Sequence, residues 1–113
     1  MPAPSQLAIQ TSVLQRLVKE EASYHKELEH QEVRIAKLEQ GGDDENAEYT
    51  LRQERKAAEE TKALFPQLKQ KIQEALTKLE SYMGQIKSSG EATDSTEIEK
   101  ATAAIAAAKE VVA

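Results

Sequence analysis

Hydrophobic residues recur in alternating steps of three and four along three separate segments of the chain. This heptad spacing is typical of helices that pack against other helices. In the first segment it predicts a helix over about residues 5–40. The seam of that helix, meaning the stripe of positions on its packing face, comprises Leu7, Gln10, Leu14, Leu17, Glu21, Tyr24, Leu28, Gln31, Ile35 and Leu38.

Two departures from a plain seam stand out in this first segment. Ile9, Val13 and Val18 lie beside the seam and widen it near the start, as expected of a helix that touches two partners. Glu21 and Gln31 put polar side chains on the seam itself. Polar seam residues usually set the register of packing or lie near the edge of a bundle, at some cost in stability.

The second segment predicts a helix over about residues 45–87, and a proline lies inside it. The seam comprises Leu51, Glu54, Ala58, Thr61, Phe65, Leu68, Ile72, Ala75, Leu79, Tyr82 and Ile86. A proline inside a helix removes one backbone donor and clashes with the preceding turn, which costs about 3 kcal/mol. Because the repeat continues on both sides of Pro66, we expect one long helix that bends near this residue.

Turn-forming residues separate the three segments. Gly41 and Gly42 favour a helix end, and the acidic stretch 43–45 offers capping oxygens for the second helix. Residues 87–94 are small and polar and predict a loop. Asp94 and Glu97 resemble a capping box at the start of a third helix, over about residues 94–112. Its seam comprises Ile98, Ala101, Ile105, Ala108 and Val112.

Short turns between three amphipathic helices favour an all-α fold, an antiparallel three-helix bundle that is elongated and has coiled-coil-like packing. We expect residues 1–113 to form this single domain, with helix two bent near Pro66. A parallel or extended dimeric coiled coil is the rival architecture, and two turns rich in Gly, Asp and Ser argue against it. The same seams could also be satisfied between chains, so a monomer and a homodimer both remain open.

The amino-acid composition limits the classes of protein to which this chain can belong. Hydrophobic residues make up 39% of the chain and charged residues 31%. The two kinds are interleaved with helical period, which predicts that the chain folds. Aromatic residues make up only 4%, so we expect a thin core. The lack of cysteine excludes disulfides and thiol catalysis. No apolar run approaches about 18 residues and the first residues do not resemble a signal peptide, so we expect a cytosolic protein without membrane contact.

Charge and chemistry exclude further functions. The net charge is −5 and no basic arm is present, so we expect no binding of nucleic acid. His25 and His30 lie on different helix faces, and His25 with Glu29 cannot complete a metal site. Neither a Gly-rich phosphate loop nor a Ser/His/Asp arrangement is present, so we expect neither an enzyme nor a bound metal or cofactor.

Three tyrosines are candidate recognition residues, because tyrosine is enriched at interface hot spots. Tyr24 and Tyr82 fall on the seams, which favours a place in the core. Tyr49 follows the acidic turn and lies off the seam, so it can cap the bundle end or meet a partner. A small bundle without catalytic residues acts through its surface.

Several of these features together resemble the tubulin-binding cofactor A family. The family pattern "KRLVKE…Y.KE…QE..I.K" is matched by residues 16–20, Tyr24, residues 26–27, residues 31–32, Ile35 and Lys37. The acidic turn with Asn46 and Tyr49 resembles the family's "ENYD" region, with Ala47 and Glu48 inserted, and Pro66 falls where the family has a proline in its central helix. The resemblance covers about residues 10–86, whereas the alanine-rich third helix matches weakly.

The resemblance implies a post-chaperonin folding cofactor of the cytoplasm and the microtubule cytoskeleton. Such a protein captures β-tubulin and holds it for assembly of the αβ-tubulin heterodimer, with other tubulin-folding cofactors as further partners and without a nucleotide. Tubulin and this chain are both acidic, so an interface needs locally basic and apolar surface. The candidate partner-binding residues are Arg16, Lys19, Lys62, Lys69, Lys71, Lys78 and Tyr49.

Two other functions are compatible with heptads. A generic coiled-coil scaffold or interaction module would show the same repeats, and the lysine-rich stretch 62–78 would then be an ordinary solvated helix face. A prefoldin-like subunit would also hold non-native chains with helical hairpins, but it needs β-strands between its helices. The turn at residues 41–45 is too short to contain them.

Overall fold

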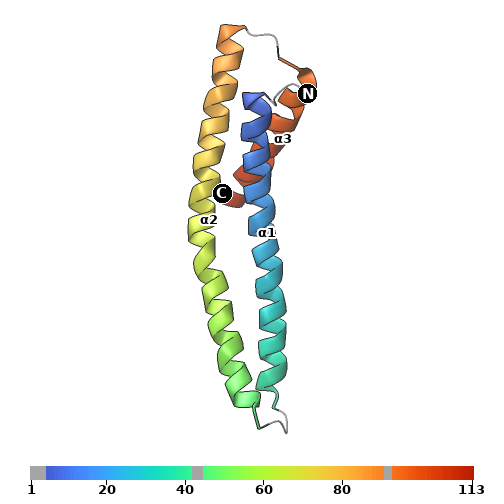
Figure 1. Cartoon of the computed structure of the whole chain (residues 1–113), viewed down its shortest axis with the longest axis vertical. Helices are drawn as coiled ribbons and strands as arrows, with labels where there is room; N and C mark the ends of the chain where they lie inside the picture. Colours follow the sequence, from blue (N-terminus) through green and yellow to red (C-terminus); the bar gives the residue numbers. More distant parts are fainter. Residues whose placement is uncertain (1–4, 42–44, 91–92) are drawn as a thin grey trace. The chain divides into compact units, whose positions relative to one another are not determined.

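The computed structural model describes residues 5–41, 45–90 and 93–113. In these residues the chain forms three α-helices and no strand, which confirms the all-α fold class (Figure 1). The helices are α1 (Gln6–Glu39), α2 (Ala47–Ser89) and α3 (Ser95–Val112). The predicted capping roles of Gly42, Asp43 and Asp44 lie outside the described residues, as do residues 91–92 of the predicted loop.

Side chains cap the starts of α1 and α3. The Ala8 N–H donates to Ser5 Oγ at 3.0 Å, and the Thr96 N–H donates to Asp94 Oδ1 at 2.8 Å. The predicted capping box at Asp94 is only half formed, because the carboxylate of Glu97 has a different partner. It accepts a hydrogen bond from the Ser5 hydroxyl at 3.0 Å, which links the beginnings of α1 and α3.

Glycines with left-handed backbone follow α1 and α2. Gly41 has φ +87° and Gly90 has φ +69°, a conformation that a side chain would strain. The Gly41 N–H donates to the Leu38 carbonyl at 3.2 Å. The predicted helix end at Gly41 is therefore confirmed.

Pro66 lies inside α2 without dividing it, as the continuous heptad predicted. The proline is exposed, and so is Lys62 four residues earlier on the same side of the helix. The Lys62 carbonyl, which has lost its intrahelical donor, can bind water there instead. The bend near Pro66 stays a prediction.

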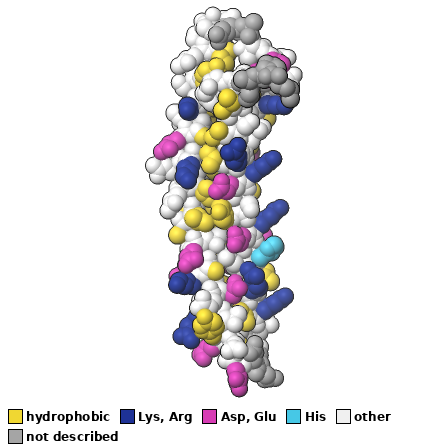
Figure 2. Space-filling model, viewed as in Figure 1, with side chains coloured by type: hydrophobic (Ala, Val, Ile, Leu, Met, Phe, Trp, Pro, Cys, Tyr) yellow, Lys and Arg dark blue, Asp and Glu magenta, His cyan; other side chains and the backbone are white. Residues whose placement is uncertain are grey.

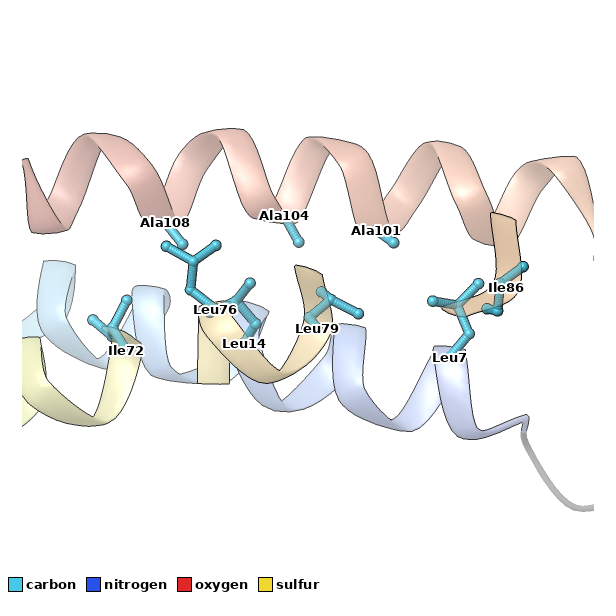
Figure 3. Packing of buried hydrophobic residues seen from close by; sticks show 9 residues of the cluster. All are labelled: Leu7, Leu14, Ile72, Leu76, Leu79, Ile86, Ala101, Ala104 and Ala108. Carbon is cyan, nitrogen blue, oxygen red and sulfur yellow. The ribbon is translucent and has the colours of Figure 1, made fainter. Parts of the chain in front are cut away.

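The chain divides into two compact units. The three-helix unit contains the residues up to Glu20 and Leu68–Ala113, and the hairpin unit contains Glu21–Gln67. The three-helix unit holds the hydrophobic core, in which the alanines of α3 point toward leucines and isoleucines of α1 and α2 (Figure 3). The core residues are Leu7, Leu14, Ile72, Leu76, Leu79, Ile86, Ala101, Ala104 and Ala108.

The hairpin unit packs the last part of α1 against the first part of α2 through a more polar seam. Among its described residues, the fully buried ones are Gln31, Ala58 and Thr61. Two ion pairs join its helices: Arg34 Nε to Glu54 Oε2 at 3.6 Å, and Arg55 to Glu39, also at 3.6 Å. This unit therefore relies less on apolar burial than the three-helix unit does.

Candidate functional site

All seven predicted partner-binding residues are exposed, and they are divided between the two units. The hairpin unit carries Tyr49, with 59% of its surface exposed, and Lys62. The three-helix unit carries the other five: Arg16, Lys19, Lys69, Lys71 and Lys78. None of the six cations takes part in the four ion pairs found among the described residues. Their charges are available to a partner.

The five cations of the three-helix unit do not form one patch. Lys71 and Lys78 are two helical turns apart and share a face of α2, whereas Lys69 is about 200° around the helix from Lys71. Lys19 lines a different surface, the groove between α1 and α3, together with Val18 and Ala104. Charge alone therefore selected residues that point in several directions.

A groove between α1 and α2 brings Lys78 together with exposed apolar side chains. One hollow is lined by Gln6, Ile9, Gln10, Val13, Ala75 and Lys78, and a second of about 240 Å³ by Gln10, Lys78, Ser81, Tyr82 and Gln85. We call these two hollows together the open groove. Figure 2 shows hydrophobic side chains along one face of the molecule, with both basic and acidic side chains among them.

Ile9 and Val13 are the site candidates that sequence reasoning missed. The widened apolar stripe predicted that they would touch a second helix, but they are 44% and 40% exposed. Val18, the third residue of that stripe, does pack against the core. The widened stripe was the available signal, but it could not tell which side of α1 the third helix would cover.

The histidines and the other tyrosines do not form a reactive site. His25 pairs with Glu21 and stacks on Phe65, with ring centroids 4.2 Å apart and planes at 19°. Tyr24 and Tyr82 are half-buried on their seams, as predicted. In the described part of the chain, no three His, Asp or Glu side chains are placed to hold a metal ion. The three helices, as far as the structure describes them, include none long and apolar enough to cross a membrane.

The arrangement offers surfaces for binding, and comparisons with known proteins give these surfaces a context. A family model for tubulin binding cofactor A matches residues 2–105. A tubulin-specific chaperone A from Saccharomyces cerevisiae is 40% identical over 81 residues, which cover 72% of this chain and 74% of that protein. A tubulin-folding cofactor A from Arabidopsis thaliana is 31% identical over 100 residues, covering 88% and 85%.

A solved structure is similar over nearly the whole chain. It is that of Rbl2p, a β-tubulin binding post-chaperonin cofactor, and it superposes with a TM-score of 0.79 at 33% sequence identity. The superposition covers 96% of this chain and 98% of that one. The similarity therefore includes α3, where the sequence pattern was weakest.

Proposed function

This chain belongs to the tubulin binding cofactor A family, and on that premise we propose that it captures β-tubulin after its release from the chaperonin. It then holds β-tubulin for assembly of the αβ-tubulin heterodimer. The observation that carries this proposal is the similarity to Rbl2p over 96% of the chain, at 33% identity. The family consists of chaperones rather than enzymes, so the chain acts by binding.

The mechanism we propose is passive capture. A helical surface covers part of β-tubulin that would otherwise associate with other chains, and a competing partner then releases it. Other tubulin-folding cofactors are the competitors expected in the cytoplasm, near the microtubule cytoskeleton. We propose that the cofactor works as a monomer or a homodimer.

The seven exposed residues predicted from charge and aromatic character are the candidate contacts. They are Arg16, Lys19, Lys62, Lys69, Lys71, Lys78 and Tyr49. A chain of net charge −5 approaches an acidic client against their mutual repulsion, so unpaired cations on the contact surface favour association. Such contacts weaken as salt rises.

The test is to incubate the purified chain with β-tubulin released from the αβ heterodimer. We expect a stable complex on a native gel and in size-exclusion chromatography. A generic coiled-coil scaffold would leave β-tubulin unbound. Separate elution of the two proteins at every salt concentration would overturn the proposed function.

A further inference from the structure

The open groove is the place where exposed apolar surface is concentrated in the three-helix unit. The described residues include four exposed large hydrophobic side chains, and two of them, Ile9 and Val13, are one helical turn apart and line the same hollow. The other two, Val33 and Tyr49, are on different helices of the hairpin unit. Scattered apolar residues are ordinary on a protein surface, whereas Ile9 and Val13 lie together in one groove.

The third helix of the chain does not use this groove. On α1, the residues that line the groove toward α3 are Gln15, Val18 and Lys19, whereas Ile9 and Val13 line the groove toward α2. On α2, Met83 and Ile86 line a hollow shared with Ile98 of α3, whereas Ala75 and Lys78 line the open groove. One side of the α1 and α2 pair is therefore covered by α3 while the open groove faces solvent.

The charged residue that lines this groove is positive, in a chain that is negative as a whole. Lys78 lines both hollows, and no other charged residue lines either of them. Lys71 lies two turns from Lys78 on the same face of α2, and Arg16 follows Val13 by three residues on α1. Glu74 lies one turn from each lysine on the same face of α2 and accepts a hydrogen bond from Gln70 at 3.4 Å. Among the described residues, neither Lys71 nor Lys78 takes part in an ion pair, so both ammonium groups can contact a partner's carboxylates.

The groove also contains an unsatisfied polar group. Gln10 lines both hollows, and its amide oxygen is buried without a hydrogen-bond partner among the described residues. A buried acceptor without a donor destabilises the free protein. Rotation of the Gln10 side chain toward the groove would bring this oxygen to a donor, which is water in the free protein and a group of the partner in a complex.

We propose that the open groove binds one amphipathic α-helix of the partner that carries carboxylates beside its apolar face. The apolar face of that helix covers Ile9, Val13 and the half-buried Tyr82, while its carboxylates lie against Lys78 and Lys71. A helix fits a groove between two antiparallel helices by the same packing that seats α3 on the other side. This inference rests on the proposed function, under which the helix belongs to β-tubulin.

The first test compares three variants of the full chain with the wild type by their affinity for β-tubulin. Val13→Asp places a charge in the apolar part of the groove, and Lys78→Glu reverses its charge. Lys87→Glu makes the same charge change about 180° around α2 from Lys78, at an exposed lysine that is not a candidate contact, and serves as the matched control. We expect the two groove variants to bind at least tenfold more weakly and the control to stay within about twofold. Circular dichroism melts check that each variant is folded, and Lys78→Glu decides the matter if Val13→Asp does not fold.

The outcomes separate the two proposals. If both groove variants bind β-tubulin as tightly as the wild type does, the groove is not the binding site, and the proposed function stays intact. A wild type that does not bind β-tubulin would overturn both. A larger loss for Lys87→Glu than for Lys78→Glu would move the interface to another face of α2 and overturn the groove as well.

A second test identifies the occupant. A photocrosslinking amino acid at position 13 is activated in the complex with β-tubulin, and the linked peptide is sequenced by mass spectrometry. We expect the crosslink to fall in a helical segment of β-tubulin with acidic residues beside an apolar stripe. A crosslink to a second copy of this chain, or to a segment without acidic residues, would overturn the inference.

Discussion

Polar residues on the seams show how single side chains shape the packing. Two seam carboxylates of the hairpin unit form ion pairs, Glu21 with His25 and Glu54 with Arg34. The hydroxyl of Thr61 donates a hydrogen bond to the Ala57 carbonyl at 3.0 Å. Gln31 is 4% exposed, and its amide oxygen has no hydrogen-bond partner among the described residues. The sequence predicted that Gln31 either sets the register or lies near the edge of the bundle, at some cost in stability, and a buried oxygen without a donor has that cost.

Replacing Gln31 with leucine is therefore expected to stabilise the protein. Gln31→Leu removes the unsatisfied oxygen and adds apolar burial, which should raise the free energy of unfolding by about 1–2 kcal/mol. Urea denaturation measures the change. Gln53→Leu, the same substitution at an exposed position of α2, is the control and should stay within about 0.5 kcal/mol of the wild type. A destabilised Gln31→Leu would show that the amide makes a bond that matters to the fold.

The seams themselves could be predicted residue by residue. Every residue assigned to the three seams is buried or half-buried, because the heptad spacing follows directly from helix geometry. Leu76 and Ala104 are also buried but lie outside the predicted seams. Leu76 lies on α2 and Ala104 on α3, and each of these helices contacts two neighbours in the three-helix unit. A stripe that packs against two neighbours is wider than one heptad seam.

At the scale of the helix, α3 is shaped by small residues. Ala101, Ala104 and Ala108 are at most 5% exposed, and they face the leucines and isoleucines of α1 and α2 (Figure 3). Alanine adds little apolar area but lets helices approach closely, so the interface has no room for a larger side chain at the fully buried Ala101 and Ala108.

Enlarging one of these alanines should destabilise the protein. Ala101→Leu, at a fully buried position, forces α3 away from its neighbours, and we expect a loss of about 1–3 kcal/mol in the free energy of unfolding, measured by thermal or urea denaturation. Ala106→Leu changes an exposed position of the same helix, so we expect it to be nearly neutral. Equal stability of the two variants would contradict the packing of α3 described here.

Pro66 offers a test of the longest helix. Pro66→Ala restores a backbone donor inside α2, so we expect unchanged or increased helicity and a gain of about 1–3 kcal/mol in stability. If the proline shapes α2 for capture, the same variant binds β-tubulin more weakly despite its stability. Circular dichroism and a binding titration measure the two effects. Higher stability with undiminished binding would show that Pro66 is incidental to function.

At the scale of the whole molecule, the two units differ in what stabilises them. The hydrophobic core cluster belongs entirely to the three-helix unit, whereas the hairpin unit has a polar seam and exposed ion pairs. Exposed ion pairs contribute little, at most about 1 kcal/mol each. Local stability should therefore differ along a single continuous helix, α2.

Amide hydrogen exchange measures this difference within α2. We expect amides near residue 55 to exchange at least tenfold faster than amides near residue 79, where Leu79 is fully buried. The comparison is internal, since both groups belong to one helix under identical conditions. Uniform protection along α2 would mean that the hairpin unit opens only when the whole chain unfolds.

The candidate site was less predictable than the fold, for a physical reason. Helix seams depend on local spacing, but the surface left open depends on which side of the α1 and α2 pair the third helix covers. Sequence reasoning chose Lys69 and Lys71 together because both are cationic, although they lie on different faces of α2. It interpreted Ile9 and Val13 as packing residues, and they are exposed.

The most direct test of the account is native mass spectrometry of the chain mixed with dissociated α- and β-tubulin. The method reports both the identity and the stoichiometry of each complex. A β-tubulin cofactor should give a complex with β-tubulin that contains no α-tubulin and that disappears as the αβ heterodimer forms. Equal binding of α-tubulin, or no complex with β-tubulin, would contradict the account.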